Sequence, residues 1–239
     1  MEAPEATSPK EHASDNCNRT LARSQGPGFT LVSMSSARTI RDPVLDHLIT
    51  PQNSAMTIID FQPLQVSSVT SRDKETLVRN VVSMAKVGKL FGLPVVLSTV
   101  NVKTGINKPM IKPITDVFPY IEPIDRTAIN AWEDEDFVRA VRAAGRKKLI
   151  IAALWTEILV HPALDALREG YDIFPVVDAV GGTTPEAHDA GLKRLIQAGC
   201  QPTTWVQLAC ELQRDWNREK TVAQFAQFLL AANSSDSLL

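Results

Sequence analysis

An aspartate at the end of an apolar run is the first residue of this sequence that could do chemistry. Asp60 closes the segment 55–60 (AMTIID), and a carboxylate there can act as a general base, as a ligand, or only as a cap of a strand end. In a parallel sheet, functional sites form outside the carboxyl ends of the strands. That rule selects three places: Asp60 with Gln62, the loop that carries Arg126, and the turn at 155–157.

The sequence lacks the motifs of several other classes of enzyme and binding site. No GxGxxG follows a strand, and neither a P-loop motif nor GxSxG occurs, which argues against dinucleotide binding, P-loop chemistry and a serine α/β-hydrolase. The three cysteines (Cys17, Cys200 and Cys210) form no metal-ligand spacing, and the four histidines are scattered. Metal sites need clustered ligands, so we expect no metal, and we also expect no cofactor. The glycines of the segment 178–184 (DAVGGTT) favour a tight turn over a phosphate cradle.

The elements that must position these residues alternate between strands and helices. Apolar runs predict strands at 55–60, 94–99, 148–154, 171–177 and 201–206. Helical periodicity predicts helices at 73–91, 133–145, 159–169 and 185–198, with a last amphipathic helix around 222–230. In the helix at 185–198 we expect Leu192, Leu195 and Ile196 to face inward. This order predicts a three-layer α/β fold, in which helices cover both faces of a parallel, Rossmann-like sheet.

The composition predicts a soluble globular protein. The chain has 239 residues, of which 44% are hydrophobic, and a formal net charge of -2, so it carries no excess positive charge for nucleic acid or an anionic membrane. The sequence contains no apolar run of about 18 residues, which is the length needed to span a bilayer. The odd number of cysteines makes a disulfide framework improbable, which favours a reducing compartment. We therefore expect a cytoplasmic protein without nucleic-acid or membrane partners.

The two ends of the chain differ from its middle. Residues 1–36 are rich in Ser, Pro and Asn without apolar periodicity, which predicts a disordered tail, and we expect a flexible end at 233–239. The arm at 37–54 contains VLDHLI, which is too apolar to be wholly solvated. The arm therefore predicts packing on the domain and a homo-oligomer.

Five segments form a recognisable pattern in this order along the chain. They are IIDFQ (58–62), IDRTAINAWEDEDF (124–137), KKLIIAALWTE (147–157), PALDALREGYDIFPVVDAVGGT (162–183) and LACELQRDW (208–216). The pattern resembles the isochorismatase-like cysteine hydrolases, and within them the YcaC-like branch. The resemblance covers roughly residues 55 to 218, and we assign residues 37–232 to this domain. It implies a sheet of about six parallel strands and a homo-oligomer.

The resemblance also implies a catalytic triad of aspartate, lysine or arginine, and cysteine, in which the thiolate attacks a small amide or a similar substrate. Asp60 matches the family aspartate in its D-x-Q setting, and Arg126 stands at the place of the cation, before the INAW stretch. Gln62 and Asn130 are the expected substrate-binding residues. A surface ion pair with a neighbouring acidic residue is the alternative role of Arg126.

The resemblance further implies an oxyanion hole, which the family builds from backbone N–H groups beside a cis peptide bond that does not precede proline. That bond maps onto Leu154–Trp155. The turn residues that map onto this place are Trp155, Thr156, Ile158 and Leu159. Trp155 could equally serve packing.

The sequence departs from the family at the nucleophile. The branch pattern reads T-E-x-C-x-x-x-P-A-L, with five residues between Glu and Pro, whereas only Ile158, Leu159, Val160 and His161 separate Glu157 from Pro162 here. The missing residue is the cysteine itself, between Ile158 and Leu159.

Three functions follow as alternatives. The first is a small-molecule hydrolase, acting on an amide C–N bond, whose cysteine is missing from this sequence. The second is a non-catalytic oligomeric relative that keeps the fold and binds a small ligand. The third is isochorismatase proper, which uses water on a vinyl ether, and it ranks last because the quoted residues resemble the YcaC-like branch more closely.

Overall fold

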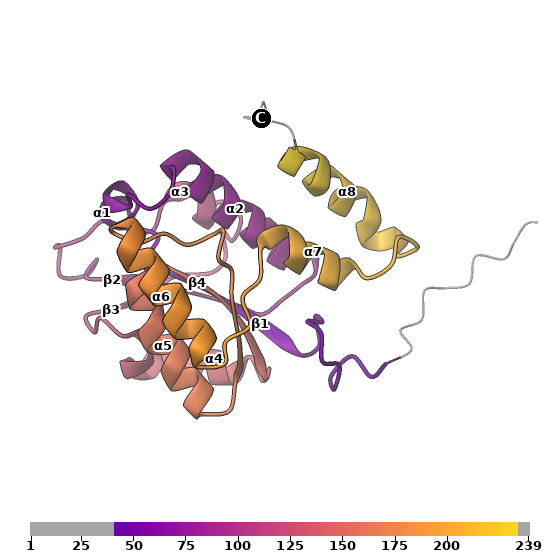
Figure 1. Ribbon diagram of the computed structural model, residues 1–239, viewed down its shortest axis with the longest axis horizontal. Helices are drawn as coiled ribbons and strands as arrows, with labels where there is room; N and C mark the ends of the chain where they lie inside the picture. Colours follow the sequence, from indigo (N-terminus) through magenta and orange to yellow (C-terminus); the bar gives the residue numbers. More distant parts are fainter. Residues whose placement is uncertain (1–40, 234–239) are drawn as a thin grey trace, which may run out of the picture. The chain divides into compact units, whose positions relative to one another are not determined.

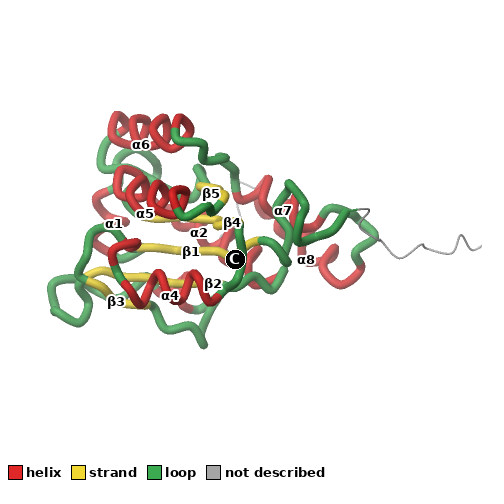
Figure 2. The backbone as a smooth tube through the Cα atoms, turned by 90° about the horizontal axis from the view of Figure 1, so that it is seen from below, coloured by secondary structure: helices red, strands yellow, loops and turns green. Residues whose placement is uncertain are grey.

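The structure is a computed structural model, and it describes residues 41–233. The tail predicted at 1–36 lies outside the described residues, as does the predicted flexible end except its first residue. A single parallel sheet forms the centre of the described part. Its strands are β1 (Ser54–Ile59), β2 (Val95–Val100), β3 (Ile124–Arg126), β4 (Lys148–Ala153) and β5 (Asp172–Pro175), in the order β3-β2-β1-β4-β5 (Figure 2).

Helices cover both faces of this sheet (Figure 1). On one face α2 (Lys74–Leu90) packs against α7 (Trp205–Gln213) and α8 (Glu219–Asn233). On the other face lie α4 (Glu135–Ala143), α5 (Thr156–Arg168) and α6 (Pro185–Gln197), where α5 contacts β4, β5 and α6. Three short helices complete the set: α1 (Pro63–Ser68), α3 (Lys112–Thr115) and the 3-10 helix η1 (Ala131–Glu133). The predicted three-layer α/β fold is confirmed, and the domain boundaries at 37 and 232 stay predictions.

The long helix α2 shows why these residues adopt this fold. The Asp73 side chain accepts a hydrogen bond from the N–H of Thr76 at 2.8 Å and so caps the helix. Leu77, Val81 and Met84 are fully buried on the face that meets the sheet. Gly88 lies so close to Met56 of β1 that a Cβ atom there would approach the Met56 side chain to 2.9 Å.

The prediction of a strand at 201–206 was wrong, and this is why the sheet has five strands. Thr203 makes only an isolated bridge to Val176. Pro202 has no N–H with which to continue a ladder. Thr204 accepts a hydrogen bond from the N–H of Gln207 and thereby starts helix α7. The carrier of Arg126, predicted as a loop, is instead the short strand β3.

The prediction that Ile196 faces inward was also wrong. Leu195 is fully buried, but Ile196 is 52% exposed. Helix α6 packs mainly on α5, so its buried face is too narrow to include all three predicted residues. None of the helices in the described part is long and apolar enough to cross a membrane.

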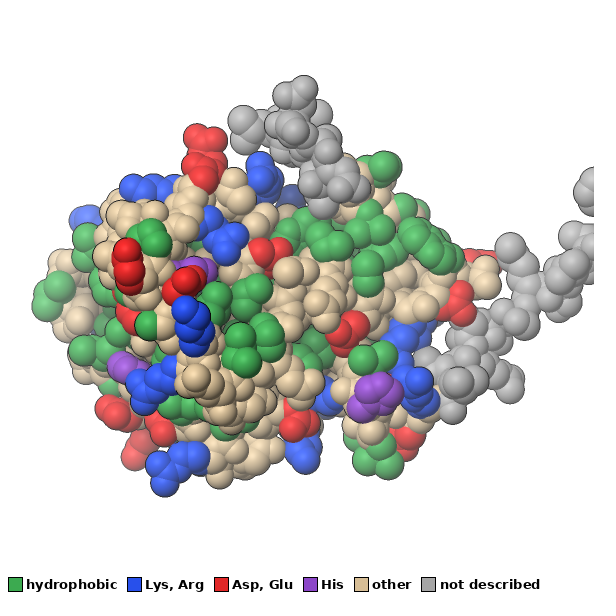
Figure 3. Space-filling model, viewed as in Figure 1, with side chains coloured by type: hydrophobic (Ala, Val, Ile, Leu, Met, Phe, Trp, Pro, Cys, Tyr) green, Lys and Arg blue, Asp and Glu red, His purple; other side chains and the backbone are tan. Residues whose placement is uncertain are grey.

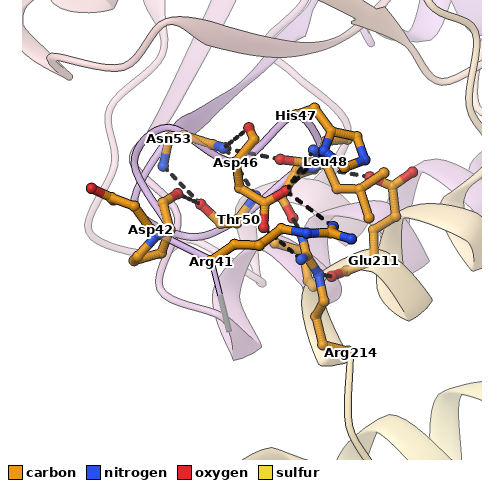
Figure 4. A network of polar contacts seen from close by, with 12 residues as sticks. Arg41, Asp42, Asp46, His47, Leu48, Thr50, Asn53, Glu211 and Arg214 are labelled. Carbon is orange, nitrogen blue, oxygen red and sulfur yellow. Dashed lines mark hydrogen bonds and ion pairs between the residues drawn. The ribbon is translucent and has the colours of Figure 1, made fainter. Parts of the chain in front are cut away.

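The arm at 41–53 is fastened to the amino end of the sheet (Figure 4). Asp46 accepts hydrogen bonds from Arg214 Nη1 at 2.6 Å and from the N–H of Leu48 at 3.0 Å. The Lys148 side chain donates to the backbone oxygens of His47 and Leu48. Burial raises the pKa of Asp46, but the Leu48 N–H and the Arg214 guanidinium outweigh it and lower the pKa to about 2.

Replacing the carboxylate of Asp46 should weaken this attachment. A carboxylate whose pKa is lowered in the folded state stabilises the protein at pH values above its ordinary pKa, and this effect is lost as the pH falls toward 2. The stabilising effect of Asp46 is therefore fully present at pH 7. We expect Asp46→Asn to lower the free energy of unfolding by about 1–3 kcal/mol, measured by urea denaturation. Asp42→Asn, on the same arm but exposed, is the control and should change it by less than about 0.5 kcal/mol. Equal effects of the two variants would contradict the attachment.

Candidate functional site

Asp60 stands directly after β1, the central strand of the sheet. Its N–H donates to the backbone oxygen of Ser98 on β2 at 2.9 Å, and its φ of 61° lies in the left-handed region. A residue other than glycine pays conformational energy there, and such positions cluster at functional sites. The turn after β1 is closed by the N–H of Gln62, which donates to the Asp60 oxygen at 2.8 Å.

Arg126 reaches Asp60 from the edge of the sheet. It ends β3, which pairs only with β2, so its side chain spans the neighbouring strand to meet β1. Its Nη2 donates to Asp60 Oδ2 at 2.7 Å, and the two residues are 3% and 4% exposed. Asp125 faces away and accepts from the N–H groups of Val102 and Lys103. The predicted meeting of Asp60 and Arg126 is confirmed, and the alternative surface pair is wrong.

This ion pair is incompletely satisfied. Asp60 Oδ1, Arg126 Nε and Arg126 Nη1 are buried without a hydrogen-bond partner among the described residues. Burial raises the pKa of Asp60, and the Arg126 guanidinium lowers it. The effect of burial is the larger one, so the pKa of Asp60 is raised to about 6. A carboxyl group with a pKa close to neutrality can both accept and release a proton under ordinary conditions. The arrangement therefore offers one acceptor, two donors and a proton acceptor to a small polar molecule.

The turn between β4 and α5 borders this pair. Leu154 follows β4 and donates its N–H to the oxygen of Ile59, the residue before Asp60. The Leu154–Trp155 peptide bond is cis, as the resemblance implied. The Trp155 indole donates to Ser68 Oγ at 2.9 Å and to the Gln65 oxygen at 3.2 Å, so this side chain fastens helix α1 over the turn.

Most of the predicted oxyanion donors in this turn are already occupied. The N–H of Thr156 donates to the Gly181 oxygen at 3.0 Å, and those of Ile158 and Leu159 both donate to the Trp155 oxygen at 2.9 Å. The Leu159 side chain is fully buried, whereas that of Ile158 is half-buried. The N–H groups of Trp155 and Glu157 are the candidates that this pattern leaves for an oxyanion.

The side-chain amides of Gln62 and Asn130, which were expected to bind substrate, form hydrogen bonds within the protein instead. Gln62 accepts from the N–H of Val100 and donates to the oxygens of Val100 and Lys108. It thereby ties the turn after β1 to the loop after β2. Asn130 accepts from the N–H of Trp132 and donates to Asp165 Oδ2 at 2.7 Å. The structure brings neither amide into hydrogen-bond contact with the Asp60–Arg126 pair.

Sequence reasoning missed a group of side chains behind the turn. Thr156 Oγ1 and His188 Nδ1 are 2.7 Å apart, and Glu157 Oε1 accepts from the N–H and hydroxyl of Thr183. A Cβ atom at Gly182 would come within 2.9 Å of Glu157 Oε2 and of His188. The glycine pair noted in the sequence was the available signal, because two adjacent glycines permit close backbone approach as well as a turn.

The remaining cysteines in the described part do not substitute for the missing one. Burial raises the pKa of Cys200 to about 11 and also raises that of Cys210, which keeps both thiols protonated and poorly nucleophilic. Cys17 lies outside the described residues. Residues 41–233 contain no group of three or more His, Cys, Asp or Glu side chains that could hold a metal ion.

Comparisons with known proteins show the family and the fold of this chain. A family model described as the isochorismatase domain matches residues 54–207. The Escherichia coli protein named probable hydrolase YcaC is 40% identical over 169 residues, covering 70% of this chain and 81% of its own length. The structure of YcaC from Pseudomonas aeruginosa with hexane-2,5-diol and covalent acrylamide has a TM-score of 0.69 and 33% identity, covering 79% of this chain and 98% of that one. The E. coli YcaC structure, described as an octameric hydrolase of unknown specificity, has the same TM-score and identity and covers 79% and 97%.

Proposed function

The chain belongs to the isochorismatase family, and we propose that it is a small-molecule hydrolase that acts on a carboxamide at Asp60 and Arg126. The observation that carries this proposal is the buried ion pair with its three unpaired polar atoms. A carboxamide supplies the complement: its N–H donates to Asp60 Oδ1, and its carbonyl oxygen accepts from Arg126.

Water is the nucleophile that this sequence leaves for the reaction. Asp60 accepts a proton from a water molecule, and the water oxygen forms a bond to the carbonyl carbon. The charge that develops on the carbonyl oxygen faces the Arg126 guanidinium, where it is stabilised. The C–N bond then breaks, the proton held by Asp60 passes to the departing nitrogen, and the products are a carboxylic acid and ammonia or an amine. Without covalent catalysis this route is slow.

A non-catalytic ligand-binding role is the second candidate, and the missing nucleophile favours it. No cysteine stands directly after Ile158, where the family pattern has it, and Leu159, which follows Ile158, is fully buried. A chain of this kind would bind a carboxamide between Asp60 and Arg126 without turning it over. The same contacts support both candidates, so activity must separate them.

We also propose that the chain self-associates. The E. coli relative is described as octameric, and the arm keeps apolar side chains exposed, with Val44 and Leu45 largely in contact with solvent. A cytoplasmic location without nucleic-acid or membrane partners stays a prediction from composition.

Hydrolysis of a panel of small carboxamides tests the enzyme proposal. Because Asp60 must be ionised to accept the proton, we expect the rate of the wild-type protein to rise with pH and to level off above about pH 6. Asp60→Asn should reduce that rate at least about a hundredfold and abolish the pH dependence. Asp116→Asn, at an exposed ion pair directly after α3, is the control and should leave the rate unchanged.

Calorimetric titration with the same carboxamides separates the two candidates. Binding that Arg126→Met weakens, without detectable hydrolysis, would replace the enzyme proposal by the ligand-binding role. Neither binding nor hydrolysis across the panel would overturn both.

A further inference from the structure

One backbone N–H group at the start of α5 has no hydrogen-bond partner within residues 41–233. The first four N–H groups of a helix have no acceptor inside the helix. In α5, those of Thr156, Ile158 and Leu159 nevertheless donate to nearby backbone oxygens at 2.9–3.0 Å. The N–H of Glu157 stands among them and is left without an acceptor in this part of the chain. Because the positive end of the helix dipole lies here, this N–H suits an oxygen that carries negative charge.

The side chain of Glu157 is anchored to the loop before α6. Its Oε1 accepts from the N–H of Thr183 at 3.0 Å and from the Thr183 hydroxyl at 2.6 Å. The backbone oxygen of Thr183 in turn accepts from the Thr70 hydroxyl at 2.6 Å. The N–H of the preceding residue, Gly182, donates to Ser71 Oγ at 2.8 Å. The Glu157 carboxylate is therefore held by a loop that is itself bonded to the segment between α1 and α2.

Helix α6 holds the neighbouring residue, Thr156. Thr156 Oγ1 and His188 Nδ1 are 2.7 Å apart, and a Cβ atom at Gly191 would approach Thr156 Cγ2 and its backbone oxygen to 3.1 Å. Burial and the Arg72 guanidinium lower the pKa of His188, which favours a neutral ring. Figure 3 shows acidic and basic side chains on the outer surface of α6, whereas His188, which meets α5, is 9% exposed. The first turn of α5 is thus in contact with α6 as well as with the loop before it.

We propose that Thr183 and the Glu157 carboxylate position the N–H of Glu157 toward the oxygen on which negative charge develops during hydrolysis. A donor stabilises such an oxygen most when it is already fixed in place before the reaction. One residue then supplies both the donor and the side chain that fixes it, because the bonds to Thr183 keep the first turn of α5 from rotating. The inference rests on the hydrolase function proposed above and adds positioning residues outside the Asp60–Arg126 pair.

A positioning role differs from a purely structural one in the ligand that it affects. Enzymes bind analogues of the transition state more tightly than substrates, through contacts that are strongest in the transition state. Butyramide is a planar carboxamide of the proposed class, and propylphosphonamidate is its tetrahedral, negatively charged analogue. Loosening the first turn of α5 should therefore weaken binding of the phosphonamidate more than binding of the amide.

Calorimetric titration of the full chain with these two compounds tests the inference. Wild type should bind propylphosphonamidate at least about tenfold more tightly than butyramide. Thr183→Val keeps the N–H but removes the hydroxyl, so it should weaken phosphonamidate binding about tenfold and change butyramide binding by less than about twofold. Thr183→Ser restores the hydroxyl and should restore the affinity for the phosphonamidate.

Thr221→Val is the matched control. The Thr221 hydroxyl, on α8, donates to Gln213 Oε1 on α7 at 2.7 Å, so this variant loses a comparable hydrogen bond that does not involve α5. It should bind both compounds as wild type does. Urea denaturation of the two valine variants verifies that both are folded.

The two compounds separate a failure of this inference from a failure of the proposed function. If Thr183→Val weakens binding of both compounds equally, or of neither, the inference is overturned and the hydrolase proposal stands. If wild type binds butyramide but binds the phosphonamidate no more tightly, the inference is overturned and the ligand-binding candidate is favoured. Binding of neither compound would overturn the inference and contradict the carboxamide class on which it rests.

Discussion

Inserting one cysteine between Ile158 and Leu159 is expected to raise carboxamide hydrolysis about a thousandfold. A covalent nucleophile divides the reaction into two easier steps, and its removal from hydrolases leaves only the residual effects of binding and electrostatics. Asp60 and Arg126 already lie together at the edge of this turn, so the inserted thiol would enter a site where a proton acceptor and a cation are in place. The cation favours the thiolate.

The insertion also changes the register of α5. One added residue advances the helix by about 1.5 Å and turns the rest of it by about 100°, which moves every later side chain relative to the turn at Leu154–Trp155. The present sequence places Leu159, a fully buried side chain in the first turn of α5, at the position that the thiol would otherwise occupy. The substitution Leu159→Cys therefore makes a matched control: it supplies the same thiol without the added residue.

Labelling with iodoacetamide and hydrolysis of the carboxamide panel measure the result. The tryptic peptide from Leu149 to Arg168 must be followed by mass spectrometry, because Cys210 is exposed and would also react. We expect fast labelling of this peptide in the insertion variant and slow labelling in Leu159→Cys. If the unmodified protein already hydrolyses amides at an ordinary enzymatic rate and loses that rate in Asp60→Asn, water is a fully competent nucleophile and the role assigned to the missing thiol is wrong.

Most of the fold could be predicted because its strands are buried on both faces. Strands β1 and β4 are mostly apolar and buried along their whole length, and α2 has a clear apolar face and an N-cap residue. The three-residue strand β3 could not be found this way, because it is too short to show a pattern and pairs with only one neighbour. The false strand at 201–206 had the right composition, but composition cannot reveal that Thr204 begins a helix.

The site was predictable where chain topology alone decides a position. Asp60 and the turn after β4 end neighbouring strands, so they had to lie at one edge. The side-chain amides of Gln62 and Asn130 were expected to bind substrate because the sequence does not reveal their hydrogen-bond partners. Those partners are backbone groups and Asp165. Likewise, the contact of Thr156 with His188 joins two residues that lie 32 positions apart on different helices, and no local pattern indicates such a pair.

Removing the cation of the site is expected to cause the largest loss of stability. Arg126→Met keeps much of the side-chain volume but leaves the Asp60 carboxylate buried without its partner, which typically costs about 3–5 kcal/mol. Because Arg126 lowers the pKa of Asp60 and burial raises it, the variant should bind a proton at Asp60 more readily. The pKa of Asp60 in the folded variant then lies above its value in the unfolded chain. Asp60 therefore stabilises the folded variant at low pH, and this effect is lost as the pH rises through the folded-state pKa.

Urea denaturation of Arg126→Met should therefore show a smaller deficit at pH 5 than at pH 7.5. The double variant Asp60→Asn/Arg126→Met removes the buried charge and should recover most of the loss at pH 7.5, whereas Arg139→Met, at an exposed pair on α4, should change the free energy of unfolding by less than about 0.5 kcal/mol. A deficit that does not depend on pH, or one that the double variant fails to relieve, would mean that Arg126 acts through packing. In that case the charge of Asp60 would have no share in the stability of this site, which would contradict its raised pKa.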